Sequence, residues 1–519
     1  MLHLRVDIPA RDGTMLRGLR YAPSDEPAPT ILVVTPYGAD RYHPDGGYFA
    51  SRGFNFVSID CRGRGDSDGE FVPFVDDAAD GNALVHRIAE HPWSNGDVVT
   101  YGGSYSGFNQ WVTAATHPEP LRAIAPVAAV YPGRDFPIVH NVPDRHAVRW
   151  LTLVNGRRRN DGPYADEALW GKAIRELIEA DRPYRDLDLF SVGQRLPVFQ
   201  EWLNHPDIDD YWLSMVPTPD QAAAVTIPAL TITGQYDDDH LGALTHLFAA
   251  TNAANDVVIG PWDHAGTRTA NTTFGGLTMA EAGKVDLKAL HADWFDWVLG
   301  RGERPAFLAD RVTYFHIGEN RWRTSPTLAQ GEESLDLRPD ATLTIDPTKA
   351  TARPTQFETE TFAFPLADLQ AHQESVLHLT DPIADPINIT GRPIAHLTLR
   401  SDLPDFDLLI SIYLIRDDTA IKLGEHPFRA RYHASLTAPT PWPTIPTSVI
   451  LPDFPFISLR TEPGDRIALH IAAPGLNRAP NFQRGGSAVD ELPGQAVAGT
   501  VRIEQSADQP SYLRLPVTR

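Results

Sequence analysis

A strand, a tight turn and a helix follow one another within residues 97–115, and this succession constrains the fold more than any other stretch. Residues 97–101 have the apolar, β-branched character of a short buried strand, and residues 108–115 are typical of a helix. Between them stands Gly-Gly-Ser-Tyr-Ser-Gly, with Ser104 inside the turn. Small residues around a serine let such a strained turn close and hold the hydroxyl clear of a sheet. The sequence therefore predicts a nucleophilic serine at the end of a central strand.

A second serine competes with Ser104 for this role. Ser67 is the centre of a literal Gly-x-Ser-x-Gly string, residues 65–69, whereas Ser106 replaces the second glycine of the string around Ser104. The loop around Ser67 is rich in arginine, glycine and aspartate, and no helix starts from it. We therefore favour Ser104 and expect Ser67 to be a turn residue that hydrogen-bonds its own loop.

Length and composition exclude several classes of protein. The 519 residues exceed the usual size of one domain, and an apolar content of 42% is enough for full cores. No apolar run is long enough to span a membrane, and the N-terminus lacks the regions of a signal peptide. The single cysteine, Cys61, excludes an internal disulfide, and a net charge of −22 argues against nucleic acid and anionic membranes as partners. A cytoplasmic enzyme is the expected class.

Two parts of the chain, residues 1–134 and 226–310, alternate strands with helices. Strands are predicted at residues 4–9, 15–21, 30–34, 55–60, 97–101, 121–127, 229–234 and 256–260. Helices are predicted at residues 78–90, 108–115 and 286–300, the last with Asp286 at its N-cap. This alternation is typical of a largely parallel sheet covered by helices.

The other two parts have different patterns. Residues 135–225 contain helix-like stretches at 166–180 and 198–215 with no strong strand between them, which predicts an inserted helical cap. The remainder, residues 311–519, predicts an all-β sandwich of the jelly-roll type. Its short alternating runs are residues 311–315, 341–345, 394–400, 408–416, 466–471 and 499–504.

An activated serine needs a base, and the base needs an orienting carboxylate. In α/β-hydrolases the acid and then the base follow the serine along the chain, each at the end of a strand. Asp237 follows the strand at 229–234, and His264 follows the strand at 256–260. The predicted triad is therefore Ser104, Asp237 and His264, with Asp238 as the alternative acid.

These motifs resemble those of the cocaine esterase and Xaa-Pro dipeptidyl-peptidase group of serine hydrolases, the CocE/NonD family. The matching segments are Arg11-Asp12-Gly13, Thr35-Pro36-Tyr37, Asp60-Cys61-Arg62-Gly63-Arg64-Gly65 with Ser67 and Gly69, Trp93-Ser94-Asn95-Gly96, Gly102-x-Ser104-Tyr105-x-Gly107, Gly260-Pro261-Trp262-x-His264 and Arg429-Ala430-Arg431-Tyr432. The resemblance implies an α/β-hydrolase domain with an inserted helical cap and a C-terminal jelly roll. It also implies an oxyanion hole made by the Tyr37 hydroxyl and the Tyr105 amide, which agrees with the lack of a His-Gly-Gly-Gly loop.

Three further residues are candidates for the substrate pocket. Asp238 and Asp239 follow the predicted acid, where the family usually has a glycine or an aromatic residue. One of them could bind a substrate ammonium, as acidic clusters do in the related α-amino-acid ester hydrolases; for Asp239 we favour capping of the helix that starts near His240. Trp150 lies where relatives place an aromatic pocket wall, and ordinary packing is the alternative.

The predicted function is hydrolysis of a small carboxylic ester or acyl bond through an acyl-enzyme. The alternatives are an aminopeptidase or acylase acting on amides, an acyltransferase, and a carbohydrate-binding protein, which would not need a triad. No metal or organic cofactor is expected, because the sequence has neither zinc-ligand spacing nor a glycine-rich phosphate loop. The expected partner is a small ester or amide, and the sequence leaves a homo-oligomer open.

Overall fold

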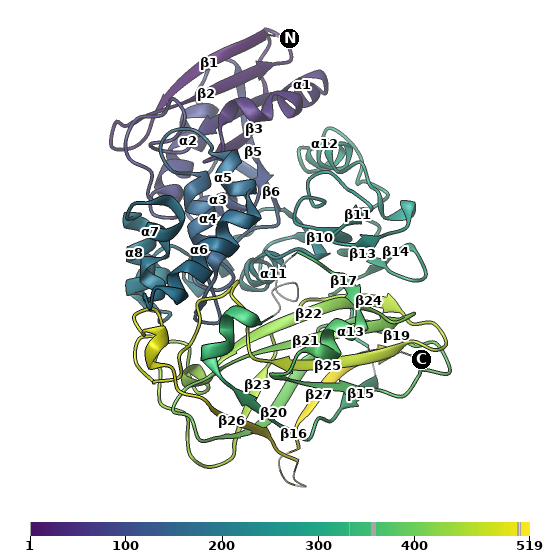
Figure 1. Ribbon diagram of the computed structural model, residues 1–519. Coiled ribbons are helices and arrows are strands. Elements are labelled where there is room, and N and C mark those ends of the chain that lie inside the picture. The colour runs from purple at the N-terminus through teal and green to yellow at the C-terminus, as the bar shows by residue number, and fades with distance from the viewer. Residues whose placement is uncertain (1, 332, 354–359, 506–507, 509, 519) are drawn as a thin grey trace.

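The chain is arranged as an α/β part, a group of helices beside it and a β-sandwich (Figure 1). This computed structural model describes residues 2–518 apart from 332, 354–359, 506–507 and 509. In Figure 1 the N-terminal strands lie at the top, the blue helices at the left and the green and yellow sandwich at the bottom. Within the described residues, no helix has the length and apolar character needed to cross a membrane.

A ten-stranded mixed sheet forms the centre of the α/β part. Across the sheet the strands are β1 (Leu2–Pro9), β2 (Met15–Ala22), β4 (Asn55–Asp60), β3 (Ala28–Thr35), β5 (Ser94–Gly103), β6 (Leu121–Val127), β9 (Ala229–Tyr236), β10 (Asn255–Asp263), β13 (Val312–His316) and β14 (Arg321–Ser325). All pairs from β4 to β13 are parallel, and the pairs at both edges are antiparallel. The largely parallel sheet predicted from the sequence is therefore confirmed.

The sheet is buried on both faces, as the continuous apolar runs of its strands require. In β3, Ile31 and Val33 join one core, whereas Leu32 and Val34 join the other, because successive side chains point to opposite faces. The first face carries α1 (His43–Ser51) and α12 (Leu287–Val298), and the second carries α2 (Asp77–Ala89), α3 (Tyr105–Ala114) and α11 (His240–Ala249). Asp286 caps α12, since its side chain accepts a hydrogen bond from the Ala289 amide at 2.9 Å.

One predicted strand joins a different sheet. The short alternating pattern of residues 311–315 predicts a strand of the β-sandwich, because it resembles that of the later runs. In the structure β13 pairs in parallel with β10, and β14 pairs with β13, so both strands extend the α/β sheet. The sequence of a single short strand does not show which strand it pairs with. Here the pairing with β10 places β13 in the α/β sheet.

The helices between β6 and β9 begin after a short hairpin of β7 (Ile138–Val139) and β8 (Val142–Pro143). They are α4 (Arg145–Leu153), α5 (Asp161–Ala165), α6 (Glu167–Glu179), α7 (Leu187–Val192), α8 (Pro197–Asn204), α9 (Asp210–Ser214) and α10 (Pro219–Ala223). The single helical stretch expected at 198–215 is split into α8 and α9. Pro206 lies between them, and a proline restricts the residue before it to an extended backbone.

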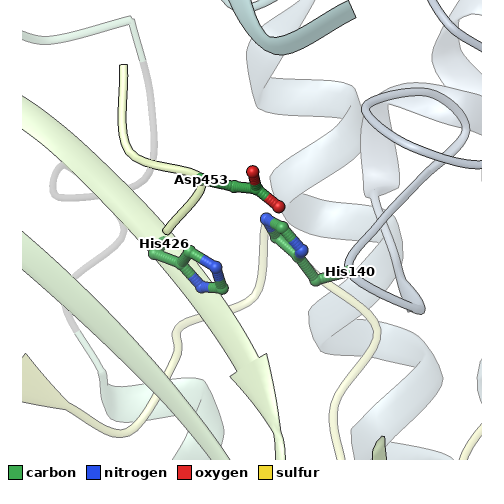
Figure 2. A group of neighbouring side chains, drawn as sticks. All are labelled: His140, His426 and Asp453. Atoms are coloured by element: carbon green, nitrogen blue, oxygen red, sulfur yellow. The ribbon is translucent and has the colours of Figure 1, made fainter. Parts of the chain in front are cut away.

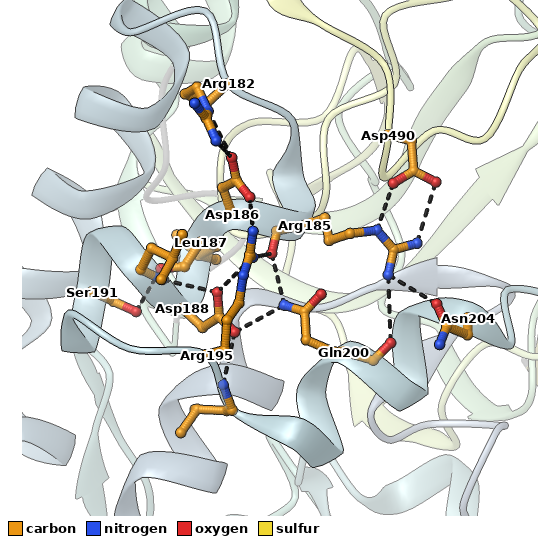
Figure 3. A network of polar contacts seen from close by, with 12 residues as sticks. Arg182, Arg185, Asp186, Leu187, Asp188, Ser191, Arg195, Gln200, Asn204 and Asp490 are labelled. Carbon is orange, nitrogen blue, oxygen red and sulfur yellow. Dashed lines mark hydrogen bonds and ion pairs between the residues drawn. The ribbon is translucent and has the colours of Figure 1, made fainter.

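A buried carboxylate holds these helices together (Figure 3). The side chain of Asp188 is completely buried and accepts hydrogen bonds from the Leu196 amide at 2.9 Å and from Gln200 Nε2 at 2.8 Å. Arg195 Nη1 lies 3.0 Å from the same carboxylate. Close by, Arg185 forms a two-point ion pair with Asp490 of the C-terminal part, at 2.5 and 3.2 Å. The first group fixes the turn between α7 and α8, and the ion pair joins the helices to the sandwich.

Two antiparallel sheets form the C-terminal part. One contains β16 (Ala341–Ile345), β26 (Gly499–Ile503), β20 (Ile394–Ser401), β27 (Tyr512–Thr518), β19 (Asn388–Gly391) and β24 (Ile457–Arg460), with β15 (Glu333–Leu337) and β23 (Thr447–Leu451) paired to its side. The other contains β17 (Ala363–Pro365), β22 (Thr419–Arg429), β21 (Asp407–Arg416), β25 (Arg466–Ala472) and β18 (Ser375–Leu379), and α13 (Leu366–Ala371) packs beside it. Their inward side chains make one core, so the predicted all-β sandwich is confirmed.

We expect Asp188→Ala to destabilise the helical cap by about 3 kcal/mol, because it leaves the buried Leu196 amide without its acceptor and removes one acceptor each from Gln200 Nε2 and Arg195 Nη1. Urea unfolding followed by tryptophan fluorescence measures this loss, and limited proteolysis should place the new cleavage between α7 and α8. Asp490→Ala is the matched control: its ion pair is half-exposed, so it should cost less than about 1 kcal/mol. Equal losses in both variants would contradict this account.

Candidate active site

Ser104 stands at the junction of β5 and α3 in a backbone conformation that side chains rarely adopt. Its φ is 60° and its ψ is −123°, and its amide donates to the Val127 carbonyl at 2.9 Å. A Cβ at position 102 would lie 2.7 Å from Ser106 Cβ, and one at position 107 would lie 2.8 Å from the Val127 carbonyl oxygen. Glycine is therefore required at both positions for the turn to close. The strand–turn–helix predicted around Ser104 is present.

Ser67 is completely buried in the loop that follows β4. Its hydroxyl donates to the Asp60 carbonyl at 2.7 Å and accepts from the Arg17 amide at 2.9 Å. These contacts tie the loop to β2 and leave the oxygen no exposed surface for a substrate. The structure thus gives Ser67 the local turn role expected from the sequence.

The Ser104 hydroxyl faces a tyrosine and a carboxylate. The Tyr37 hydroxyl, at the end of β3, donates to Ser104 Oγ at 3.4 Å, and Ser104 Oγ donates to Asp239 Oδ2 at 3.4 Å. Trp150 Nε1 donates to the Tyr37 hydroxyl at 3.2 Å. Burial raises the pKa of Tyr37, so the phenol keeps the proton that it donates. Among the residues described, Ser104 has no hydrogen bond to His264.

Asp237 and His264 lie together at the carboxyl ends of β9 and β10. Asp237 Oδ1 is 2.8 Å from His264 Nδ1, and Asp237 Oδ2 accepts from Thr233 Oγ1 at 2.8 Å. Asp238 Oδ1 is farther from the same nitrogen, at 3.3 Å, and its side chain is 56% exposed, whereas that of Asp237 is fully buried. Distance and burial therefore both favour Asp237 over Asp238 as the carboxylate that orients the imidazole.

The other nitrogen of His264 is occupied by an arginine. Arg268 Nη2 lies 2.9 Å from His264 Nε2, and Arg268 Nη1 donates to the His264 carbonyl at 2.8 Å. A guanidinium carries only donors, so Nε2 must accept in this contact and the proton must sit on Nδ1. This is the tautomer that a general base needs, but its acceptor atom is already engaged.

The charges around His264 pull its pKa in opposite directions. Burial and Arg268 lower the pKa, while Asp238, Asp239 and Asp237 raise it, and the net result is a pKa of about 9. Burial acts to raise the pKa of Asp237, but its hydrogen bond from His264 lowers it overall. A protonated imidazole could not accept from Arg268. The contact with Arg268 therefore belongs to the neutral form of His264, which is the form that can act as a base.

A cluster of carboxylates lies on the Nδ1 side of the imidazole. Burial, together with the neighbouring Asp237 and Asp238, raises the pKa of Asp135 to about 8, although the hydrogen bonds that its oxygens accept from the Tyr131 and Gly242 amides lower it. Burial and the neighbouring carboxylates also raise the pKa of Asp239. A cation bound beside these carboxyls would stabilise their ionised forms and lower their pKa values.

Asp239 does not act as the helix cap that the sequence suggested. It occupies the N-cap position of α11, but its side chain makes no capping hydrogen bond. Its Oδ2 instead accepts from Ser104 Oγ. The preference of aspartate for N-caps is worth about 1 kcal/mol. In this structure the side chain of Asp239 makes the contact with Ser104 Oγ and not a capping hydrogen bond.

The Tyr105 side chain points away from Ser104. Its hydroxyl donates to Asp77 Oδ2 at 2.5 Å and accepts from the Phe74 amide at 2.8 Å, in the core beneath the elbow. What Tyr105 offers the site is its backbone amide, the first of α3, and the first amides of a helix have no acceptor within that helix. This amide belongs to the residue that follows Ser104, and the Tyr37 hydroxyl lies 3.4 Å from Ser104 Oγ.

All these groups line one cavity of about 1390 Å³. Trp150 and Arg149 come from the helical cap, Asp237 and His264 from the α/β part, and Glu425 from the sandwich, so all three parts contribute walls. The position of Trp150 in the wall agrees with the pocket role considered for it. An opening of this size accommodates a small-molecule substrate.

Among the residues that the structure describes, two groups of side chains at or beside the cavity have the ligand types and the spacing to hold a metal ion. In the first, shown in Figure 2, the rings of His140 and His426 stack face to face, with centroids 3.9 Å apart and planes 16° apart. Stacked rings direct their nitrogen lone pairs side by side, so the pairs do not converge on one ion. Asp453 is also held by Arg134 at 2.7 Å and Arg392 at 3.3 Å. This arrangement therefore suits a polar wall better than a metal centre.

The second group consists of Asp237, Asp238 and His264. An ion there would have to replace the Nδ1 proton that joins His264 to Asp237. This group is therefore suited to act as a histidine base that is oriented by a carboxylate.

Sequence reasoning missed Asp135 and Arg268. Asp135 follows β6 in a loop without any motif and reaches the site through its bond to α11. Arg268 stands four residues after His264 in an irregular loop. The only available signal was its closeness in sequence to the predicted base, and this does not fix the direction of a long side chain.

Comparison with known proteins agrees with this geometry. Residues 12–266 match the family model of the X-Pro dipeptidyl-peptidase (S15 family), and residues 308–514 match that of the X-Pro dipeptidyl-peptidase C-terminal non-catalytic domain. The chain belongs to the cocaine esterase and Xaa-Pro dipeptidyl-peptidase family of serine hydrolases. It is a serine hydrolase of ester or acyl bonds, and the aminopeptidase alternative fits the same family.

Two curated relatives and two solved structures illustrate the likeness. The chain is 27% identical to the cocaine esterase of Rhodococcus sp. (strain MB1 Bresler), over 99% of this chain and 98% of that protein. It is 24% identical to a putative serine esterase of Mycobacterium bovis, over 90% and 84%. An α-amino acid ester hydrolase superposes with a TM-score of 0.85 at 20% identity, and an aminopeptidase from a marine sediment Thaumarchaeota archaeon with 0.83 at 19%. Both structures cover 100% of this chain, with 96% of their own length, and show that the fold is shared.

We expect Asp238→Asn to lower the pKa of His264 from about 9 by roughly one unit. The carboxylate stabilises the charged imidazole, so its removal makes the proton leave at lower pH. NMR titration of the protein labelled with ¹⁵N-histidine measures the shift. Asp238→Glu keeps the charge and should leave the pKa near its original value; a His264 pKa that is the same in Asp238→Asn would contradict the electrostatic account.

Proposed function

We propose that Ser104 is the nucleophile, His264 the general base and Asp237 the carboxylate that orients it. The observation that carries this proposal is the alignment at Ser104: a strained elbow places Oγ 3.4 Å from the Tyr37 hydroxyl, which is itself held by Trp150. A phenol in this position can donate to a tetrahedral oxyanion without reorganisation. The Tyr105 amide is the second donor of the proposed oxyanion hole.

The reaction begins when Ser104 Oγ turns from Asp239 to His264 Nε2 and Arg268 leaves that nitrogen. His264 takes the serine proton as Oγ bonds to the substrate carbonyl carbon, and the negative charge forms on the carbonyl oxygen between Tyr37 and the Tyr105 amide. His264 then gives the proton to the leaving group as the carbon–leaving-group bond breaks. Water attacks the acyl-Ser104 with His264 again as base, which releases the acid and restores the hydroxyl.

The carboxylate cluster suggests the acyl group. Asp239 Oδ2 lies 3.4 Å from Ser104 Oγ, and Asp135 and Asp238 are close enough to raise its pKa. A protonated amine next to the substrate carbonyl would stabilise the ionised forms of these carboxyls. We therefore propose α-amino acyl esters as the preferred substrates. Among structures with this fold are one named as an α-amino acid ester hydrolase and one named as an aminopeptidase, which is consistent with such substrates.

Two other activities use the same acyl-enzyme. Hydrolysis of an α-amino acyl amide, as an aminopeptidase or acylase performs it, needs the same ammonium site and differs in the leaving group. Acyl transfer to another nucleophile differs only in what replaces water. The ester comes first in the proposal because the similar curated proteins are named as esterases.

The proposal extends to the setting of the enzyme. The single cysteine, Cys61, is a buried free thiol, which suits a reducing compartment, and we place the enzyme in the cytoplasm. A net charge of −22 favours a small-molecule partner over nucleic acid or an anionic membrane. A homo-oligomer is compatible with this proposal.

The first test compares Ser104→Ala with Ser67→Ala on the p-nitrophenyl ester of alanine. Ser104→Ala should lower kcat by at least about 10³-fold, because it removes the atom that forms the acyl-enzyme. Ser67→Ala should keep near-normal kcat and lose about 1 kcal/mol of stability through two lost hydrogen bonds. Full turnover by Ser104→Ala would refute the proposed nucleophile.

The same assay tests the acyl amine. The p-nitrophenyl ester of propionic acid has the same carbon skeleton as that of alanine but lacks the ammonium. A higher kcat/KM for the alanine ester supports the cluster as an ammonium site, and equal values remove that part of the proposal. The p-nitroanilide of alanine then compares amide with ester turnover.

We expect Tyr37→Phe to lower kcat by about 10²- to 10³-fold with little change in KM, because the donor acts on charge that develops only in the transition state. Trp150→Phe is the matched control: it keeps an aromatic wall and removes only the Nε1 bond to the Tyr37 hydroxyl, so its loss should be smaller. Steady-state kinetics on the alanine ester separates the two, and a Tyr37→Phe enzyme with unchanged kcat would exclude Tyr37 from the oxyanion hole.

A further inference from the structure

Arg268 is a cavity arginine that carries its charge without a carboxylate partner among the residues described. Its guanidinium donates to the carbonyl and to Nε2 of His264, both neutral acceptors, and it lies against Gly103, where a Cβ would be 2.7 Å from Arg268 Nε. Arg149 and Arg159, which also line the cavity, each pair with a carboxylate, Glu167 and Asp161. A guanidinium held only by neutral acceptors at a cavity wall is available to an anion.

The place of Arg268 determines which part of a substrate it would meet. In the proposed reaction, His264 Nε2 delivers its proton to the leaving group, so the leaving group must approach this nitrogen. Arg268 Nη2 lies 2.9 Å from Nε2. The acidic cluster lies on the other side of the ring, within 3.6 Å of Nδ1. The imidazole therefore separates two sides of the cavity. The carboxylates on the Nδ1 side suit a cationic group of the substrate, and Arg268 on the Nε2 side suits an anionic group.

Arg268 also competes with Ser104 for the same atom. A neutral imidazole has one acceptor nitrogen, and Nε2 cannot accept from the guanidinium and from the serine hydroxyl together. A carboxylate on the leaving group would attract the guanidinium into a two-point ion pair, which is stronger than a bond to a neutral nitrogen. Its arrival would free Nε2 at the moment when the substrate is in place.

We propose that Arg268 binds a carboxylate carried by the leaving alcohol or amine, and that this contact releases His264 Nε2 for Ser104. The inference rests on the proposed triad and adds a specificity-determining residue to it. The substrate class is then an ester or amide with an amino group on the acyl side and a carboxylate on the leaving side. Hydrolysis of such a substrate breaks only the acyl bond, and the proton of Ser104 goes to the leaving group through His264.

The test uses two alanine esters that differ only in the charge of the leaving group, those of 4-hydroxybenzoic acid and of 4-hydroxybenzamide. For each enzyme the measured quantity is the ratio of kcat/KM for the acid to that for the amide. Arg268→Gln should lower this ratio by about tenfold or more, because it removes an ionic hydrogen bond to the carboxylate. It should also raise turnover of the amide-bearing ester, since Nε2 is no longer occupied.

Two variants sharpen the comparison. Arg268→Lys keeps the charge without the planar pair of donors, so it should recover part of the ratio. Arg159→Gln is the matched control, because it removes a cavity arginine near Tyr37 that already has a carboxylate partner, and its ratio should equal that of the unsubstituted protein. A purely structural role of Arg268 would lower turnover of both esters equally and leave the ratio unchanged.

Failure of this inference is distinct from failure of the proposed function. If the unsubstituted protein hydrolyses the esters through Ser104 but the ratio is the same in Arg268→Gln, the inference is wrong and the triad stands. If Ser104→Ala keeps its turnover, or if the unsubstituted protein hydrolyses neither ester, the proposed function fails and the inference fails with it.

Discussion

The rest of the site depends on one strained turn. Ser104 has φ 60° and ψ −123°, a conformation that costs about 1–3 kcal/mol for a residue with a side chain. The turn persists because the Ser104 amide bonds to the Val127 carbonyl and because Gly102 and Gly107 leave room for neighbours that a Cβ would strike. With β5 and α3 fixed in this way, the end of β5 faces the ends of β3, β9 and β10. Parallel strands share one carboxyl edge, so Tyr37, Asp237 and His264 all reach the same place.

Electrostatics organises the site around the imidazole. Three carboxylates approach Nδ1 and one guanidinium approaches Nε2, so the ring separates opposite charges. Burying carboxylates so close together is costly, and backbone amides offset part of this cost: Asp135 accepts from Tyr131 and Gly242. The remaining imbalance appears as the raised pKa of Asp135 and Asp239. Perturbed groups of this kind, gathered in a cavity, are typical of functional sites.

Most of the α/β fold could be predicted from the sequence because its signals are local and repeated. Apolar β-branched runs, helical spacing and the Asp286 cap each depend on neighbouring residues, and each agrees with the structure. The errors concern long-range partners. The run at 311–315 has the same alternation as a sandwich strand, and only its pairing with β10 places it in the other sheet. The helix expected over 198–215 is broken at Pro206, a local signal that the pattern of aromatic residues outweighed.

The residues of the site show the same difference between local signals and long-range contacts. Ser104, Tyr37, Asp237 and His264 are brought together because each follows a strand, and the order of strand ends can be read from a sequence. Arg268 and Asp135 lie in irregular loops, and their directions are set by what they meet across the cavity. Asp239 combines both cases, since its position at the start of α11 is local while its side chain turns to Ser104. A local preference worth about 1 kcal/mol sets the direction of a side chain only where no stronger contact is available. At the carboxyl edge of this sheet, contacts from several strand ends are available.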